Sequence, residues 1–341
     1  MSAELRVNLE QLRANVRAVR ERMAPSEVLV VIKDDAYGQG VEPIVGAALD
    51  AGARWFGGID VDSAVRAKRV AGDRARVFCW MTVSADEARA AIAAGLELGV
   101  GDAAYLEQVA AIGGPATVHL KIDTGLRRNG VRPERWRAFC ARAAEHERAG
   151  RIRVAGIWSH IAEASDADDD VSRALFDAAV TVARGEGLSP ETRHLAASAA
   201  AWHRPEFRYE MVRIGAFCYG VRSADGPDIP GTAPISSLVA KAISIGEDVE
   251  ISLGAVDGYP SALAGRAHAA TPGGARPVVR VDPFSSRVEA WPGAAVGDEV
   301  ILFGDGGHGE PTPTDLAELI DTVGEEPLLR VSPLVPRVYT P

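Results

Sequence analysis

The chain has 341 residues, of which 37 are basic and 47 acidic, so its formal net charge is −10. Hydrophobic residues make up 47% of it, which is enough for a large core and excludes a wholly disordered protein. The acidic balance argues against general nucleic-acid binding, because such binding requires a clustered positive surface. At this length we expect two domains.

The cysteines and the first residues of the sequence further limit the class of protein. Cys79, Cys140 and Cys218 are odd in number and widely spaced, which fits neither a disulfide framework nor a zinc site. Asp305 and His308 lie in a glycine-rich stretch that predicts a turn rather than a metal site. The start of the chain lacks the pattern of a signal peptide, and no later run is long enough to span a bilayer. We therefore expect a cytoplasmic protein without a metal.

Up to about residue 225, short apolar runs alternate with amphipathic segments. The runs are rich in β-branched residues, which is typical of parallel strands buried on both faces. The segments have apolar residues three and four positions apart, which predicts helices. Strands are predicted at residues 28–32, 77–81, 116–122 and 154–158, and helices at 41–51, 85–94, 133–149 and 170–185. This alternation indicates a (β/α) barrel or a doubly wound sheet, and periodicity does not choose between them.

The pattern changes at residues 223–231, which are rich in proline and glycine. Beyond them, short strands broken by turns are predicted at residues 237–245, 249–253, 275–281, 298–303 and 328–339. The domains are therefore predicted as an α/β domain at residues 1–225 and a smaller, mostly β domain at residues 226–341.

The most informative segment is residues 31–40, which read VIKDDAYGQG. Lys33 directly follows a buried strand, at the carboxyl end where the active sites of barrels lie. A lysine in this place is suited to Schiff-base chemistry. A solvated loop lysine would have the same spacing, so the position alone does not distinguish it from a Schiff-base lysine.

This segment is similar to the pyridoxal-phosphate signature of the alanine racemase family, usually KANAYGHG. Further matching segments follow in the family's order at residues 121–130, 156–162, 194–200 and 211–220, with a fainter match at 335–337. The resemblance implies a fold-type III enzyme of amino-acid metabolism with pyridoxal 5′-phosphate. It implies a TIM-type (β/α)8 barrel followed by a smaller, mostly β C-terminal domain. It also implies a homodimer with its active sites at the interface, an amino-acid substrate, and neither nucleic acid nor membrane as a partner.

The resemblance also implies roles residue by residue. Lys33 would carry the cofactor as a Schiff base and act as the base at Cα. Arg213 would face the pyridine nitrogen with support from His194. Lys121 matches a position that is carbamylated in some family members, which the sequence does not decide. The other cofactor-binding residues are Tyr37, Ser198 and the amides of Gly215 and Ala216 around the phosphate, and Arg128 and His160 around the ring.

Arg213 also bears on the reaction. Because an arginine is always protonated, it donates to the ring nitrogen, which then stays unprotonated. The ring is therefore a poorer electron sink than one paired with a carboxylate. This argues against decarboxylation and favours reactions with a short-lived carbanion.

The chain departs from the family on the second face of the substrate. In the family a catalytic tyrosine opens the motif GYADGYP, but residues 254–260 read GAVDGYP, so Ala255 stands in its place. Tyr259 matches the second tyrosine of the motif, which is not the catalytic one. Pro283, which has no N–H, stands where the family has a substrate-binding methionine. Pro333 stands where the family has a tyrosine that contacts the phosphate.

The barrel thus keeps its cofactor-binding residues, whereas the β domain lacks groups that act on the substrate. We infer one-base chemistry at Cα through Lys33: aldol-type Cα–Cβ cleavage or transfer, α-proton exchange, or half-transamination. Loss of one base should slow ordinary racemisation by about 10²–10⁴. One alternative is a racemase or epimerase whose substitute second base is His268, His308 or a residue of the partner chain. Another is a non-catalytic pyridoxal-phosphate-binding protein.

Overall fold

The computed structural model describes residues 3–82, 84–224 and 226–341. These residues fold into two units. The barrel unit consists of Val19–Lys33 and Gly52–Gly215, and the sheet unit consists of the residues up to Ala18, Asp34–Ala51 and Ala216–Pro341. Both units therefore contain segments from the first 225 residues. No helix among the described residues combines the length and the hydropathy needed to cross a bilayer.

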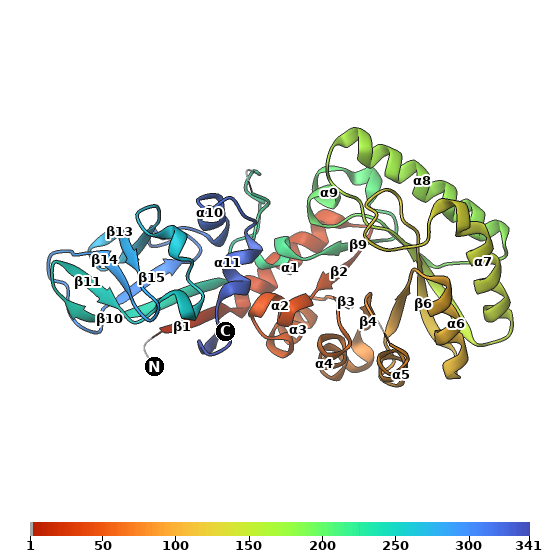
Figure 1. The fold of residues 1–341 in the computed structure, drawn as a ribbon, viewed down its shortest axis with the longest axis horizontal. Coiled ribbons are helices and arrows are strands. Elements are labelled where there is room, and N and C mark those ends of the chain that lie inside the picture. The colour runs from red at the N-terminus through yellow and green to blue at the C-terminus, as the bar shows by residue number, and fades with distance from the viewer. Residues whose placement is uncertain (1–2, 83, 225) are drawn as a thin grey trace. The chain divides into compact units, whose positions relative to one another are not determined.

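In the described part of the barrel unit, eight parallel strands form one sheet in the order β8-β7-β6-β5-β4-β3-β2-β9 (Figure 1). Strands β3 and β5 are buried along their whole length, as their apolar runs predict. Together with the helices between the strands, this confirms the expected (β/α)8 barrel. The strands are β2 Glu27–Val31, β3 Trp55–Gly58, β4 Arg76–Cys79, β5 Glu97–Val100, β6 Ala116–Lys121, β7 Ile152–Trp158, β8 Thr192–His194 and β9 Met211–Ile214.

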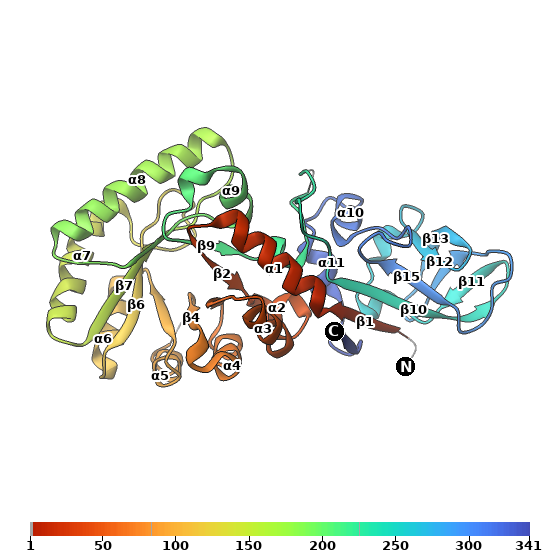
Figure 2. The same cartoon turned by 180° about the vertical axis from the view of Figure 1, so that it is seen from behind.

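Capping side chains fix where the helices of the barrel unit begin. After β3, β4, β5 and β7 the N-cap is Asp60, Ser84, Asp102 or Ser165, and each accepts a backbone N–H three positions on at 2.8–3.2 Å. Helices α4 to α8 lie on the outside of the strands (Figures 1 and 2). The helices are α4 Val61–Ala71, α5 Ala85–Ala93, α6 Ala103–Ile112, α7 Pro133–Arg148, α8 Asp166–Gly185 and α9 Ser198–His203.

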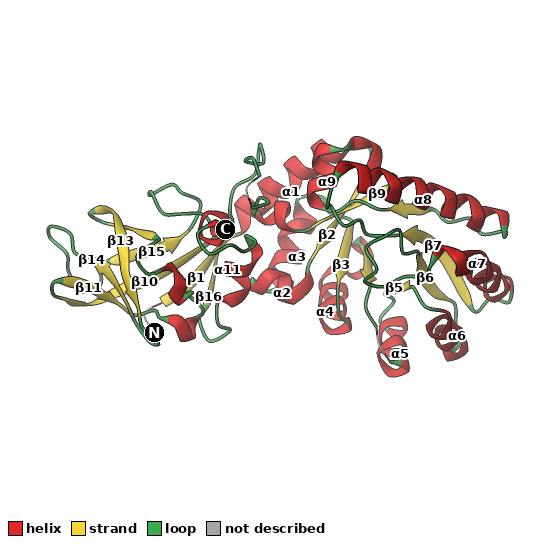
Figure 3. Ribbon diagram, turned by 45° about the horizontal axis from the view of Figure 1, so that its top comes forward, coloured by secondary structure: helices red, strands yellow, loops and turns green. Residues whose placement is uncertain are grey.

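The sheet unit is built on a mostly antiparallel sheet with the order β11-β14-β13-β12-β15-β10-β1-β16 among its described residues (Figure 3). Strand β1 (Ala3–Asn8) pairs antiparallel with β10 and parallel with β16, so both ends of the chain join this sheet. The other strands are β10 Ser236–Ile245, β11 Asp248–Ile251, β12 His268–Thr271, β13 Gly274–Val281, β14 Ser286–Glu289, β15 Glu299–Phe303 and β16 Arg337–Thr340.

Helices complete the sheet unit and overturn one prediction. The strand expected at residues 328–339 is wrong, because helix α11 (Glu325–Arg330) precedes the short strand β16. Glu326 and Arg330 form an i,i+4 ion pair, which supports a helical turn that apolar spacing alone did not indicate. The remaining helices are α3 Val41–Asp50 and α10 Pro313–Glu318, with α1 Leu9–Met23 and α2 Lys33–Gly38 each running from a segment of one unit into a segment of the other.

Candidate active site

A strained turn follows Lys33 directly. Asp34, Asp35, Ala36 and Tyr37 have φ angles of 53°, 53°, 56° and 58°, so they form a left-handed turn. For L-residues this backbone costs roughly 1–2 kcal/mol each, and none of the four is a glycine. Strain of this kind persists only where the surrounding structure imposes it, and it clusters at functional sites. The backbone thus marks the segment after Lys33 independently of its sequence motif.

Strand β16 holds this turn in place within the sheet unit. The Arg337 Nε–H donates to the Gly38 carbonyl at 2.9 Å, and the Tyr339 hydroxyl donates to the Gln39 carbonyl at 2.9 Å. The Arg337 guanidinium also donates to three carbonyls of residues 331–335 at 2.6–3.0 Å. The C-terminal strand therefore stabilises the backbone that begins at Lys33.

Tyr37 and Ala216, both predicted around the phosphate, lie in the sheet unit. Tyr37 is 3% exposed, and its ring centroid is 4.7 Å from that of Tyr219. Tyr219 closes the short turn that Ala216 begins. Burial raises the pKa of both phenols well above the usual value, so both stay protonated near neutral pH. The structure thus brings the Tyr37 ring against the turn that starts at Ala216.

Ser198 and Gly215, the other two residues predicted around the phosphate, meet in the barrel unit. Ser198 is the first residue of α9, and Gly215 directly follows β9. The Gly215 amide donates to the Ser198 hydroxyl oxygen at 3.2 Å. A serine hydroxyl beside a glycine amide leaves room for the backbone to approach an anion closely.

Arg213 is a deeply buried cation of the site. It is 5% exposed, and Nη2 donates to the carbonyls of Ser159 and Leu195 at 2.9 and 2.8 Å. Its Nη1 lies 3.2 Å from Nδ1 of His194, and its Nη2 lies 3.1 Å from Nδ1 of His160. Burial and the charge of Arg128 lower its pKa to about 9, so it remains charged at neutral pH.

His160 lies within electrostatic reach of the other predicted cations. Burial lowers its pKa to about 3, and the charges of Arg213, Arg128, Lys121 and Lys33 act in the same direction. Its imidazole is therefore neutral over the physiological range. The structure thus brings His160 within electrostatic reach of four cations that come from three other sequence motifs.

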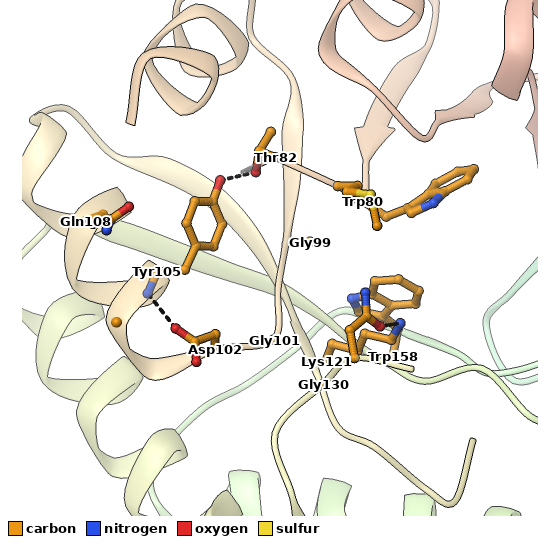
Figure 4. Close-up of a pocket in the computed structure, with 13 residues that line it drawn as sticks. Trp80, Thr82, Gly99, Gly101, Asp102, Tyr105, Gln108, Lys121, Gly130 and Trp158 are labelled. Atoms are coloured by element: carbon orange, nitrogen blue, oxygen red, sulfur yellow. Dashed lines mark hydrogen bonds between the residues drawn. The ribbon is translucent and has the colours of Figure 1, made fainter. Parts of the chain in front are cut away.

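Lys121 lines a pocket of about 420 Å³ (Figure 4). Its Nζ lies 4.2 Å from the centroid of the Trp158 ring and donates to the Asn129 side-chain oxygen. Trp80, Lys121 and Trp158 lie together on one side of the pocket, and Tyr105 lies on the other. Burial lowers the pKa of Lys121 to about 7, and the charges of Arg213 and Arg128 add to this effect.

Two buried cations of this site, Arg213 and Lys121, have no carboxylate ion-pair partner among the described residues. Buried charges in proteins are ordinarily paired, so the site is suited to an anionic group. A phosphorylated pyridine with a ring hydroxyl, as in pyridoxal phosphate, fits this set of donors.

Sequence reasoning missed two residues that contact this site. His119 and Glu97 are buried polar residues of β6 and β5, and His119 contacts His194. A histidine within the apolar run at residues 116–122 was the available signal. A buried histidine is common in cores, so this signal alone did not point to the site.

The sheet unit contains the positions at which the chain departs from the family that its motifs resemble. Ala255 is exposed at the start of a short turn, and its amide donates to the Asp282 carbonyl at 2.9 Å. The Tyr259 side chain is 1% exposed, and its hydroxyl has no partner among the described residues. Burial raises its pKa well above the usual value, so Tyr259 is not a ready proton carrier. The Pro283 carbonyl accepts the Val256 amide at 2.9 Å.

The lowered pKa of Lys121 predicts a pH-dependent cost to folding. Between about pH 7 and the usual pKa of 10.5, the unfolded chain holds a proton on this amine that the folded chain lacks. Stability should therefore rise with pH in this window, by up to about 1.4 kcal/mol per pH unit. Lys121→Met should flatten the rise, as measured by urea unfolding at several pH values. A variant at the partly exposed Lys68 serves as the control, and equal slopes in all three proteins would contradict the prediction.

Comparison with known proteins agrees with this geometry. The family model for the alanine racemase N-terminal domain matches residues 7–223, and that for the C-terminal domain matches residues 248–339. An alanine racemase of Thermobifida fusca is 35% identical over 99% of this chain and 98% of its own length, and one of Salinispora arenicola is 34% identical over 99% and 98%. The crystal structure of alanine racemase from D-cycloserine-producing Streptomyces lavendulae has a TM-score of 0.93 at 31% identity and covers 100% of this chain and 97% of that one.

Proposed function

This chain belongs to the alanine racemase family, and we propose that it performs one-base chemistry at Cα of an amino acid with Lys33 as the proton carrier. Its cofactor is pyridoxal 5′-phosphate, which withdraws electrons from Cα of a bound amino acid and so acidifies the Cα–H bond. The proposal covers α-proton exchange, aldol-type Cα–Cβ cleavage or transfer, and half-transamination.

The buried cations Arg213 and Lys121, which have no carboxylate ion-pair partner among the described residues, support the proposed cofactor contacts. Lys33 would hold the cofactor covalently through Nζ, and Arg213 would donate to its pyridine nitrogen with His194 behind it. Arg128 would reach the ring hydroxyl, and His160 would pack beside the ring. The proposed phosphate ligands are Tyr37, Ser198 and the amides of Gly215 and Ala216.

Arg213 limits what this site can stabilise. Its guanidinium stays charged, so it would donate to the ring nitrogen and leave that nitrogen unprotonated. The ring would then withdraw electrons less strongly, which favours reactions that quickly return a proton to Cα or form a new bond there. Lys33 would carry that proton on one face of Cα, within the site and away from bulk water.

The observation that carries one-base chemistry is the pair Ala255 and Tyr259. A methyl group at Ala255 cannot transfer a proton. The Tyr259 hydroxyl is buried in the sheet unit with a raised pKa, so it does not replace the missing phenol. Pro283 supports the proposal from the substrate side, since it has no N–H to offer a substrate carboxylate. We also propose a homodimer in which the partner's sheet unit completes the site, and sedimentation as a monomer would contradict this arrangement.

A racemase with a substitute second base is the second candidate. It is favoured by the curated alanine racemases that are 34–35% identical over nearly the whole chain. His268 and His308 are exposed in the sheet unit, and Nε2 of His268 lies 3.0 Å from the carbonyl of Gly309. An imidazole nitrogen can accept and donate a proton, so either histidine is a candidate for that base.

Exchange of the α-proton in D₂O separates these candidates. L- and D-alanine and a few larger amino acids are incubated with the holoenzyme, and the products are analysed for deuterium and for configuration. Exchange of one enantiomer with retention is the expected result. Exchange with inversion would establish a second base, and racemisation would then be the favoured function. Cofactor-loaded protein that exchanges no α-proton would instead indicate a non-catalytic binding protein.

A further inference from the structure

A continuous chain of hydrogen bonds crosses the interior of the barrel unit. Arg213 Nη1 lies 3.2 Å from His194 Nδ1, and His194 Nε2 lies 2.9 Å from His119 Nδ1. His119 Nε2 lies 2.9 Å from a Glu97 carboxylate oxygen, and Arg76 Nη2 donates to the same oxygen at 2.8 Å. The five residues come from β9, β8, β6, β5 and β4. The hydrogen-bond chain therefore begins at the first residues of β4 and β5 and ends at the predicted cofactor site.

The donors and acceptors of this chain allow one arrangement of protons. Arginine only donates, so Nδ1 of His194 must accept and its Nε2 must carry the proton. That Nε2–H donates to Nδ1 of His119, which in turn places the proton of His119 on Nε2. The His119 Nε2–H then donates to the Glu97 carboxylate. Each imidazole is thus held in one tautomer by a cation at one end and an anion at the other.

The surroundings keep both histidines neutral and Glu97 ionised. His119 and His194 are both 0% exposed, and burial lowers the pKa of each below the usual value. Burial acts to raise the pKa of Glu97, but hydrogen bonds from His119 and Arg76 outweigh it and lower the pKa to about 2. The arrangement of protons derived from geometry therefore holds over the whole physiological range.

The fold leaves space for this hydrogen-bond chain at Gly156 of β7. A Cβ at this position would lie 2.2 Å from Nδ1 of His119, which is closer than real contacts allow. The neighbouring strand thus lacks a side chain where the imidazole passes. The path is therefore built into the sheet, and it does not depend on a mobile surface group.

We propose that Glu97 is a positioning residue that acts through His119 and His194 to orient the Arg213 guanidinium toward the cofactor. The inference rests on the proposed contact of Arg213 with the pyridine nitrogen. Glu97 touches neither the cofactor nor the substrate. It supplies the fixed anion that keeps both imidazoles protonated on Nε2, so that Nδ1 of His194 accepts from Arg213.

The first test reads the tautomers in the unmodified full chain. Ring-nitrogen chemical shifts of the histidines, measured at neutral pH, should place the N–H of both His119 and His194 on Nε2. An N–H on Nδ1 in either residue, or a doubly protonated ring, would overturn the inference. This measurement needs no variant and no activity, so it stands even where a substitution impairs folding.

The second test compares two glutamates with like contacts. Glu97→Gln keeps the size of the side chain and removes its charge, and we expect the Kd for pyridoxal phosphate to rise about tenfold or more, as is typical of supporting residues behind a ligand. Glu107 also accepts two hydrogen bonds from an arginine, Arg142, and contacts a histidine, His146. It lies on α6 and takes no part in the hydrogen-bond chain from Arg213 to Arg76. Glu107→Gln should leave the Kd unchanged.

A third variant separates failure of this inference from failure of the proposed function. Arg213→Lys removes the guanidinium itself, so it should weaken cofactor binding whether or not Glu97 acts through it. If Arg213→Lys weakens binding and Glu97→Gln does not, the positioning role of Glu97 is wrong. If neither variant changes the Kd, the contact of Arg213 with the cofactor is wrong, and this inference is overturned with it.

Discussion

Replacement of Lys33 by alanine is expected to remove the absorbance of protein-bound cofactor and to lower α-proton exchange by about 10³-fold or more. The variant loses both the amine that would hold the cofactor covalently and the proposed proton carrier at Cα. Lys33 lies two positions beyond the end of β2 and directly before the strained left-handed turn, so no neighbouring side chain has the same backbone placement. Absorbance spectra and the D₂O exchange assay measure the two losses separately.

The control for this variant is Lys68→Ala. Lys68 lies in α4 and donates to the Gly72 carbonyl at 2.8 Å, and we assign it no part in the site. It should keep both signals. If the Lys33 variant retains the absorbance of bound cofactor, the assignment of Lys33 is wrong. If only the exchange survives, another group carries the proton.

Ala255→Tyr is expected to raise alanine racemisation by about 10²-fold or more. The change restores a phenol that can transfer a proton on the second face of Cα. Ala255 is exposed in the sheet unit, so a larger side chain fits there without displacing the core of that unit. The measurement is the rate at which L-alanine gives D-alanine, followed by chiral analysis.

Ala255→Phe is the matched control, because it adds the same ring without the hydroxyl. It should show no gain. Pro283→Met, added to Ala255→Tyr, restores a backbone N–H near the substrate and should increase the gain further. Equal racemisation by the tyrosine and phenylalanine variants, with no gain in the Pro283→Met combination, would show that Ala255 is not the position of the missing base.

Much of the fold could be predicted from the chain, because local pattern and burial agree in the strands of the barrel. The strands expected at residues 28–32, 77–81, 116–122 and 154–158 correspond to β2, β4, β6 and β7 within two residues at each end. The error at residues 328–339 arose where apolar residues occur without a clear period. There the Glu326–Arg330 pair and the contacts of Arg337 decide the local structure.

The left-handed turn after Lys33 could not be predicted from its sequence. Asp34, Asp35, Ala36 and Tyr37 have no local preference for this backbone, and a glycine, the usual signal, is absent from all four positions. The turn is held by hydrogen bonds from Arg337 and Tyr339, about 300 residues further along the chain. Such strain becomes visible only when its distant supports are in place.

The sequence by itself determined the alternation of strands and helices through hydrophobic period, and the family resemblance through residue types at fixed short spacings. The barrel and the cofactor followed from that resemblance. Only the tertiary structure decided which polar residues act together. Arg213 and His194 are 19 residues apart, His194 and His119 are 75 apart, and His119 and Glu97 are 22 apart. The order of the strands, with Gly156 of β7 between β6 and β8, brings these residues within hydrogen-bond distance inside a buried, low-dielectric interior, where each must find a partner. No local pattern encodes a contact made by strand order.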